Sequence, residues 1–200
     1  SPENQETFKL GYVPGTRNWL MNFLTAKKYS PKFLAESGLF STKSEKMNPY
    51  FFDRLMFPIF NLHGEVIAFG GRMLRDGQPK YLNSPETSLF RKSETLYGIY
   101  QAKEAIRKEK SFFLVEGYLV GLESYQAGIK NAIAASGTAF TVEQGRIIGR
   151  MSRKVTLLFD GDKAGMSAAA RGADNLLASD LTIGVAVLPE GEDPDSYVQK

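Results

Sequence analysis

The sequence has 200 residues and a mass of 22.2 kDa, a length that fits one large domain or two small ones. It contains no cysteine and one histidine, His63, which excludes disulfides, cysteine-ligated zinc and two-histidine metal sites within it. No apolar run approaches the roughly 18–20 residues of a membrane-spanning helix, so we expect no membrane partner. Any bound metal would be a hard ion held by carboxylate oxygens.

Charge is distributed unevenly along the sequence. Residues 1–110 carry 17 lysines and arginines against 11 aspartates and glutamates, a net charge of +6, whereas residues 111–200 carry 8 against 11, a net charge of −3. A basic first half favours a polyanionic partner, and an acidic second half favours clustered carboxylates that bind divalent cations. The sequence has no signal-peptide pattern and no initiator methionine, so we expect it to be a piece of a longer chain.

The first third of the sequence is predicted to be mainly helical. Between residues 16 and 39 the apolar residues fall on helical faces, and Ser30-Pro31 is typical of the start of a second helix. Trp19 and Phe23 have helical spacing and are predicted to be packing residues rather than a platform for stacked bases. Residues 41–50 are polar and are predicted to form a loop.

A β-hairpin and a stiff loop are predicted next. The apolar runs 55–60 and 66–69 flank a short turn that contains His63, which we therefore expect to be exposed rather than catalytic. Phe51 and Phe52 are predicted to pack under this hairpin. Prolines within residues 79–87 exclude helix and predict a stiff loop. The other predicted element of this half is a helix over residues 96–107.

After residue 110 the sequence alternates strand and helix. The strands are continuous apolar runs, as expected when both faces of a sheet are covered. They are predicted at 112–115, 132–135, 155–159 and 183–188, with helices ending near residue 127 and spanning 141–151 and 164–177. This pattern predicts an α/β fold, with a parallel sheet flanked by helices in residues 111–200 and a smaller mixed α+β basic subdomain in residues 1–110.

Acidic residues follow three of the predicted strands. They are Glu116, the pair Asp160 and Asp162, and the pair Asp193 and Asp195. Carboxylates at partly desolvated strand ends repel one another unless cations are bound, and the intervening Gly161 permits a sharp turn that lets two side chains meet at one ion. Magnesium prefers such oxygen ligands and bridges to phosphates. Two such ions would support phosphoryl transfer.

Each acidic cluster alone is more typical of a structural role. Asp-Gly is common in turns, and aspartate before proline often caps a helix. Three clusters at successive strand ends nevertheless favour a catalytic metal site, because parallel strands bring their carboxyl ends to one edge of the sheet.

Several motifs resemble the Toprim fold of primases and topoisomerases. They are Val115-Glu116-Gly117-Tyr118, Ala135-Ser136-Gly137-Thr138 and Phe159-Asp160-Gly161-Asp162-Lys163-Ala164-Gly165. Further motifs are similar to those of bacterial DNA primases of the DnaG type. These are Arg54-Leu55-Met56-Phe57-Pro58-Ile59, Phe69-Gly70-Gly71-Arg72, residues 79–87, Leu96-Tyr97-Gly98 and residues 189–195. The resemblance extends from about residue 10 to residue 200.

The resemblance implies roles for individual residues. Glu116 corresponds to the Toprim glutamate of metal binding or general acid–base work, and Asp160 and Asp162 correspond to the metal-binding pair. Asp193 and Asp195 correspond to further acidic residues of the metal site. Four polar or basic residues correspond to positions that contact nucleotides or nucleic acid: Arg72, Lys80, Asn83 and Lys92.

The resemblance also implies a function. It is that of the catalytic core of a DNA-dependent RNA polymerase, which makes short RNA primers on a single-stranded DNA template by nucleotidyl transfer from ribonucleoside triphosphates. The implied cofactors are two or more Mg²⁺ or Mn²⁺ ions, with zinc only in a separate N-terminal domain. The implied partners include an RNA–DNA hybrid and, through a C-terminal domain outside this sequence, the replicative helicase. The implied location is the bacterial cytoplasm, and the family's C-terminal helical part also lies outside this sequence.

One position departs from the family pattern. Members usually carry an aspartate four residues after the Toprim glutamate, where this sequence has Val120; Glu123, about one helical turn further on, is an imperfect substitute. Two alternatives to the primase therefore stay open. One is a degenerate Toprim module that binds single-stranded DNA or nucleotides, and the other is a Toprim nuclease or topoisomerase.

Overall fold

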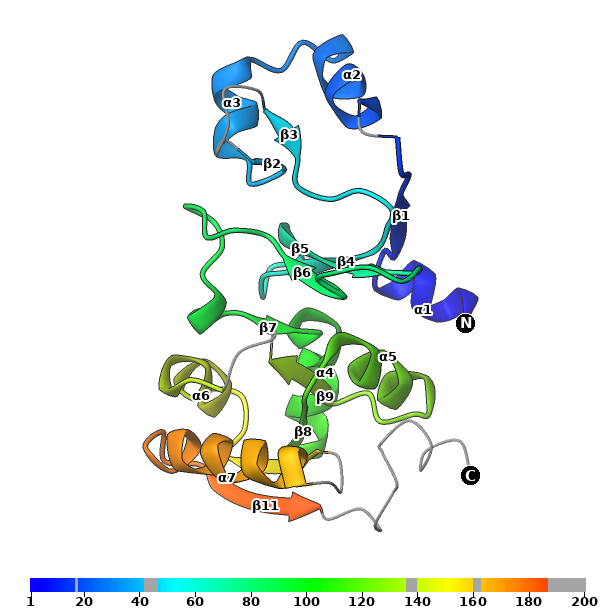
Figure 1. The fold of residues 1–200 in the computed structure, drawn as a ribbon. Helices are drawn as coiled ribbons and strands as arrows, with labels where there is room; N and C mark the ends of the chain where they lie inside the picture. The colour runs from blue at the N-terminus through cyan, green and yellow to red at the C-terminus, as the bar shows by residue number, and fades with distance from the viewer. Residues whose placement is uncertain (17, 42–46, 136–139, 160–162, 187–200) are drawn as a thin grey trace. The chain divides into compact units, whose positions relative to one another are not determined.

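The computed structural model describes the whole chain except residues 17, 42–46, 136–139, 160–162 and 187–200 (Figure 1). It contains two compact units. The antiparallel-sheet unit comprises residues 8–59 and 66–91, and the parallel-sheet unit comprises residues 1–7, 60–65 and 92–200. None of the helices in the described ranges is long and apolar enough to cross a bilayer.

The antiparallel-sheet unit is built on a four-stranded sheet in the order β1-β4-β5-β6. Its strands are β1 (Gly11–Val13), β4 (Arg54–Phe60), β5 (Val66–Met73) and β6 (Tyr81–Asn83). Two short helices, α2 (Trp19–Ala26) and α3 (Pro31–Glu36), follow β1, and β2 (Phe40–Ser41) pairs antiparallel with β3 (Asn48–Pro49). The Ser30 hydroxyl accepts the Phe33 N–H (3.2 Å), which caps α3 as its sequence predicts.

The predicted hairpin is confirmed. Strands β4 and β5 are neighbours joined by a turn in which Gly64 N–H donates to Asn61 O (3.1 Å), and His63 is exposed there. Phe51 is 2% exposed and its ring lies 6.5 Å from that of Phe69, so it packs under the sheet as expected.

Two loop predictions in this unit are wrong in part. Residues 79–87 were expected to form no regular element, but Tyr81–Asn83 pair with β5 as strand β6. The prolines at 79 and 85 exclude helix but leave three residues between them that can join the edge of a sheet. Likewise, the predicted loop 41–50 contributes residues to β2 and β3 at its two ends.

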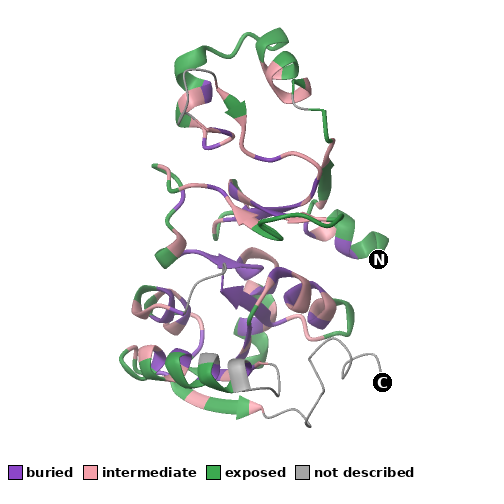
Figure 2. Ribbon diagram, in the orientation of Figure 1, coloured by how far each residue is buried: buried purple, intermediate pink, exposed green. Residues whose placement is uncertain are grey.

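The packing prediction for α2 is wrong for Phe23, whereas Trp19 is half-buried. All eight residues of this helix are exposed or half-buried, and the Phe23 side chain is 50% exposed. Figure 2 shows the same contrast, with α2 half-buried or exposed and strands β8 and β9 of the other unit mostly buried. Helical spacing of Trp19 and Phe23 does not establish burial, because it is equally compatible with an apolar face turned to solvent.

The parallel-sheet unit has a five-stranded sheet in the order β11-β10-β8-β9-β7. Its elements are α1 (Pro2–Thr7), the 3₁₀ helix η1 (Lys92–Glu94), β7 (Leu96–Tyr97), α4 (Ile99–Glu109), β8 (Phe112–Val115), α5 (Tyr118–Gln126), β9 (Ala132–Ala135), α6 (Val142–Gly149), β10 (Lys154–Leu158), α7 (Lys163–Leu177) and β11 (Thr182–Ala186). Strands β8 to β11 are mutually parallel, which confirms the predicted α/β fold class.

Residues 96–107 were predicted to form one helix, but the structure divides them. Leu96 and Tyr97 form β7, which pairs antiparallel with β9 at the edge of the sheet, and helix α4 starts only at Ile99. Gly98 between them has φ +81°, a left-handed conformation that suits glycine and ends the strand. The helix α1 was not predicted, and the Asn4 side-chain amide ties it to α5 by donating to Leu122 O (2.9 Å).

The core of this unit consists of side chains from the strands and the inner faces of the helices. Helices α4 and α5 pack on β9, α7 packs on β10 and β11, and α6 packs on α7. Fully buried members include Ile106, Phe112, Leu114, Ile133, Ile148, Leu157 and Leu176. This packing fixes the carboxyl ends of β8 and β10, where the predicted acidic residues begin.

Candidate active site

The parallel sheet changes direction between β8 and β10. From β8 the chain passes through α5 to β9 on one side, and from β10 it passes through α7 to β11 on the other side. Such a reversal in an open α/β sheet leaves a crevice beyond the carboxyl ends of the two strands, where ligands usually bind. The predicted Toprim carboxylates begin directly after these two strands.

Glu116 stands at this edge. It follows Val115, which pairs with Leu158 near the end of β10, and its side chain is exposed. Two residues later, the buried Tyr118 begins α5 and places its ring 4.7 Å from that of Tyr97 in an edge-to-face contact. Burial, with a smaller effect of Tyr118, raises the pKa of Tyr97 and keeps this phenol neutral. The backbone around Glu116 is therefore held by a neutral, packed core.

The other four predicted acidic ligands are Asp160, Asp162, Asp193 and Asp195, and they lie outside the described residues. In the described ranges, no group of three or more histidine, cysteine, aspartate or glutamate side chains could hold a metal ion. The strand register nevertheless brings the described ends of β8, β10 and β11 together, because Leu158 pairs with both Val115 and Ala186. Carboxylate oxygens are the ligands of hard divalent ions, so the chemistry of Glu116 and of the four aspartates predicted with it fits such a metal.

Val120, the departure from the family pattern, lies in the first turn of α5. Its side chain is half-buried. Glu123 lies three residues further on the same helix and is also half-buried. Residues three apart share a helical face, so Glu123 follows Val120 along the helix, away from the Glu116 end.

The antiparallel-sheet unit carries three of the four predicted phosphate-contacting residues. Arg72 pairs with Tyr81 across β5 and β6, and Asn83 pairs with Gly70. Lys80 directly precedes β6 and is exposed, while the Arg72 guanidinium carbon lies 5.9 Å from the centre of the Tyr81 ring. Among the described residues, nothing accepts a hydrogen bond from the buried Nε of Arg72. The sheet thus aligns two cations and an amide on adjoining strands.

Arg54 is a further functional candidate. It was included in a motif from the sequence but was assigned no role there. Its side chain is 3% exposed and donates to three backbone carbonyls: Gly71 O (3.3 Å), Lys80 O (3.3 Å) and Pro79 O (2.8 Å). Burial lowers the pKa of Arg54. An arginine inside an otherwise apolar strand was the available signal, because a buried cation needs partners.

Glycine at position 71 makes the path of Arg54 possible. A Cβ atom at Gly71 would lie 3.0 Å from Arg54 Cδ and 2.9 Å from Phe51 Cδ1, closer than ordinary van der Waals contact. The Arg54 side chain therefore crosses β5 at Gly71. Its hydrogen bonds fix the backbone at Gly71, Pro79 and Lys80.

Lys92, the fourth predicted phosphate contact, lies in η1 of the parallel-sheet unit. Its carbonyl accepts a hydrogen bond from the side-chain amide of Gln144 (2.9 Å), which also donates to Thr95 O (2.7 Å). Gln144 is 0% exposed and forms a capping box with Thr141 at the start of α6. Gln144 was also missed as a site residue, although Thr141-x-x-Gln144 is a recognisable capping sequence.

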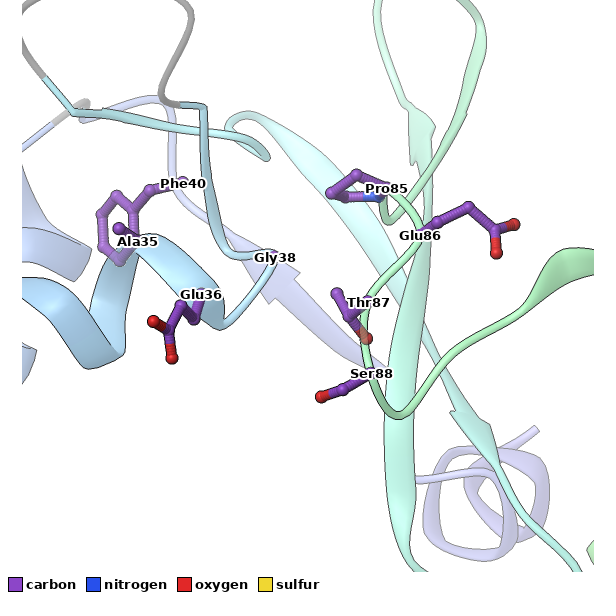
Figure 3. A pocket seen from close by; sticks show the side chains of 8 residues that line it. All are labelled: Ala35, Glu36, Gly38, Phe40, Pro85, Glu86, Thr87 and Ser88. Atoms are coloured by element: carbon purple, nitrogen blue, oxygen red, sulfur yellow. The ribbon is translucent and has the colours of Figure 1, made fainter.

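A pocket of about 440 Å³ lies between the end of α3 and the segment after β6 (Figure 3). Glu36 reaches it from α3, and Thr87 and Ser88 reach it from the segment after β6. None of its eight lining residues is basic, and two of them are glutamates. Because carboxylates repel a triphosphate, we assign this pocket no role in phosphate binding.

Comparison with known families gives two matches in chain order. Residues 1–103 match the family described as DNA primase catalytic core, N-terminal domain, and residues 113–198 match the family described as Toprim-like. The DNA primase of Halalkalibacterium halodurans is 43% identical over 200 residues, covering 99% of this chain and 33% of the relative. The chain thus spans about a third of the length of this curated relative.

Solved structures give the same result. The zinc-binding and RNA polymerase domains of the Aquifex aeolicus primase superpose with a TM-score of 0.93 at 35% identity, covering all of this chain and 49% of that one. A DnaG primase catalytic domain bound to single-stranded DNA superposes with a TM-score of 0.88 at 35% identity, covering all of this chain and 63% of that one. With more than half of its length matched by a primase family, the chain belongs to the bacterial DNA primases of the DnaG type.

Proposed function

We propose that this chain is part of the catalytic core of a primase that makes short RNA primers on single-stranded DNA. The observation that carries the proposal is the reversal of strand order between β8 and β10, with Glu116 at one strand end and the Asp160 motif following the other. The similarity to a DnaG catalytic domain bound to single-stranded DNA supports the choice of template. The substrates would be ribonucleoside triphosphates, and the reaction would be nucleotidyl transfer.

The acidic residues would form the metal-binding part of the site. We assign divalent-ion binding, with Mg²⁺ or Mn²⁺ as the ions and two or more of them, to Glu116, Asp160, Asp162, Asp193 and Asp195. When bound, such ions lower the pKa of an attacking hydroxyl and neutralise developing charge on phosphate oxygens. Glu116, exposed at the end of β8, is also suited to take up a proton from the primer 3′-hydroxyl.

The basic and amide residues would orient the phosphates. Arg72, Lys80 and Lys92 supply positive charge, and Asn83 supplies an amide that can donate to a phosphate oxygen. Arg54 holds the carbonyls of Pro79 and Lys80, so it would act on substrate only by positioning Lys80. In this assignment residues 1–110 serve mainly nucleic-acid binding and residues 111–200 serve metal binding.

The proposal includes a cellular setting. We infer that the complete protein acts in the bacterial cytoplasm, holds an RNA–DNA hybrid during synthesis, and meets the replicative helicase through a domain outside this sequence. A zinc ion would belong to a separate N-terminal domain, a proposal that the zinc-binding domain of the Aquifex aeolicus primase supports.

Primer synthesis by variants of the complete protein tests the proposal. We expect Asp160→Asn and Glu116→Gln to reduce the incorporation of labelled ribonucleotides on a single-stranded template by about 100-fold or more. Asp174→Asn is a matched control, because Asp174 is an exposed aspartate on α7. Normal priming by Asp160→Asn, with its folding verified by circular dichroism, would overturn the assignment.

The same assay separates a binding module from an enzyme. Val120, at a position where the family usually has an acid, is the observation that favours a module without activity. Binding of single-stranded DNA by the complete protein without any primer extension, at saturating Mg²⁺ and Mn²⁺, would support that second candidate.

A further inference from the structure

Helices α2 and α3 present large aromatic side chains to solvent. Phe23 is 50% exposed, Tyr29 is 45% exposed and Phe33 is 56% exposed. Contiguous exposed apolar surface of this kind marks interaction sites more often than chance. The exposed rings require an explanation, because the fold of the unit does not use them.

The aromatic rings are arranged in two pairs. The ring centres of Trp19 and Phe23 are 6.2 Å apart on α2, and those of Tyr29 and Phe33 are 5.4 Å apart and nearly parallel at 16°. The Tyr29 N–H donates to Leu24 O (3.3 Å), so a short turn joins the two pairs. Paired rings lose little conformational entropy when a further planar group stacks on them.

Positive charge accompanies these rings. Between residues 7 and 35 the sequence contains five lysines and arginines and no aspartate or glutamate. Lys27, Lys28 and Lys32 are exposed, and Lys27 Nζ lies 5.2 Å from the centre of the Phe23 ring. Glu36, at the end of α3, is the first carboxylate after this stretch, so cations outnumber carboxylates on these two helices. A surface with such an excess of cations is complementary to a polyanion rather than to a typical protein surface.

We propose that the aromatic–lysine surface, defined by Trp19, Phe23, Lys27, Tyr29, Lys32 and Phe33, binds single-stranded DNA. The bases would stack on the exposed rings and the phosphates would contact the lysines, the combination used by proteins that bind single strands without sequence preference. A duplex offers no bases to these rings, because its bases are already stacked on one another, so a single strand fits the surface better. The inference rests on the proposed function only in taking DNA, rather than RNA, as the strand.

This surface is formed by other elements than the residues assigned to phosphates above. Arg72, Lys80 and Asn83 lie on or beside strands β5 and β6, whereas this surface lies on α2 and α3. A second contact with the same DNA strand would act through effective concentration. It would raise the affinity of the whole protein for the DNA template without taking part in the chemical reaction.

Conservative substitutions in the complete protein test the stacking. We expect the double variant Phe23→Leu, Phe33→Leu to bind a fluorescent dT₂₀ strand about tenfold or more weakly by anisotropy, because leucine keeps apolar area but has no π-face. Phe23→Tyr, Phe33→Tyr should bind as wild type does. Leu177→Ala, which removes a 65% exposed apolar side chain on α7, is the control and should have no effect.

Charge and location are tested separately. Lys27→Gln, Lys32→Gln should reduce the slope of log K against log salt by about 1.4, the value for two phosphate contacts on a single strand. A dT₂₀ strand with 5-bromodeoxyuridine should crosslink within residues 19–33 on irradiation. An rU₂₀ strand is expected to bind more weakly than dT₂₀.

Three results would overturn the inference: unchanged dT₂₀ binding by the leucine variant, crosslinks confined to other segments, or preferential binding of rU₂₀. If the leucine variant binds DNA normally while another domain of the complete protein protects residues 19–33 from proteolysis, the surface is a protein contact. Primer synthesis is measured in parallel. Absence of synthesis by the wild type would refute the proposed function but not the DNA-binding surface, whereas unchanged DNA affinity with normal synthesis would refute only the surface.

Discussion

Arg54 is a buried cation whose identified acceptors are all backbone carbonyls. These acceptors are 17 to 26 residues further along the chain, so one guanidinium joins β4 to both sides of the segment that carries Lys80. Hydrogen bonds from charged donors contribute about 1.5–3 kcal/mol each in net terms. Losing this donor removes all three of these hydrogen bonds, although Lys80 O still accepts the Met73 N–H (2.9 Å).

We therefore predict that Arg54→Met lowers the free energy of unfolding by about 2–4 kcal/mol. Methionine fills the space of the aliphatic stem but cannot donate. Arg54→Lys should lose less, because its ammonium group can reach one of the carbonyls. Urea denaturation followed by circular dichroism measures the difference, and equal stabilities of the methionine variant and the wild type would contradict the prediction.

A substitution at Val120 is predicted to increase the affinity for a divalent ion. Val120→Asp should bind Mn²⁺ several-fold more tightly than the wild type, because it places a carboxylate in the first turn of α5, four residues after Glu116. The first turn of a helix also favours negative charge. Val120→Asn, of equal size and without charge, is the matched control. Isothermal titration calorimetry with Mn²⁺ measures the affinities of the two variants. Equal affinities would show that position 120 does not contribute to the metal site.

At the scale of elements, one side chain connects α6 to η1. The Gln144 amide donates to Lys92 O and Thr95 O while its oxygen accepts the Thr141 N–H (3.0 Å). Thr141 adds a hydrogen bond from its hydroxyl to Ser93 O (2.5 Å). The capping box of α6 therefore also fixes the backbone under Lys92.

Gln144→Leu is predicted to lower the free energy of unfolding by about 2–3 kcal/mol, since it removes the capping box and the two hydrogen bonds that the Gln144 amide donates to Lys92 O and Thr95 O. Thr141→Ala removes mainly the capping hydroxyl and should cost about 1 kcal/mol. Thermal denaturation of both variants measures the two losses in the free energy of unfolding. A Thr141→Ala effect as large as that of Gln144→Leu would contradict the prediction that the two bonds from the Gln144 amide contribute more than the Thr141 hydroxyl does.

Elements with a strong local signal were predictable from sequence. The strands Phe112–Val115 and Ala132–Ala135 have their predicted bounds, because each is an apolar run bordered by polar residues. Strand β7 was read as helix because Leu96 has helical spacing to Ile99 and Ile106, and only the left-handed Gly98 separates them. Strand β6 was missed because prolines exclude helix without specifying a partner strand.

The candidate site was predictable only in part, for a related reason. The position of Glu116 at a strand end follows from the residues next to it, although its role is still a prediction. The contacts of Arg54 and Gln144 depend on carbonyls of distant segments, and carbonyls are present at every residue. Sequence alone therefore gives no signal of which carbonyl a buried donor will meet.

Across the whole molecule, the two compact units divide the charge more sharply than the halves of the sequence do. Residues 8–59 and 66–91 carry 12 lysines and arginines against 5 aspartates and glutamates, a net charge of +7, and the rest of the chain carries 13 against 17, a net charge of −4. The first unit would attract nucleic acid and the second would attract divalent cations. The proposed function needs both.

The acidic unit gives a prediction that needs no catalysis. An ion that binds only the folded protein stabilises it by about 2.7 kcal/mol at 100 times its dissociation constant, so Mn²⁺ should raise the melting temperature of the wild type. Asp160→Asn should lose most of this increase, and Asp174→Asn, on the exposed face of α7, should keep it. NaCl at equal ionic strength controls for screening. If Mn²⁺ stabilises Asp160→Asn as much as the wild type, the stabilising ion binds elsewhere, and the acidic charge of this unit does not reflect a metal site at the end of β10.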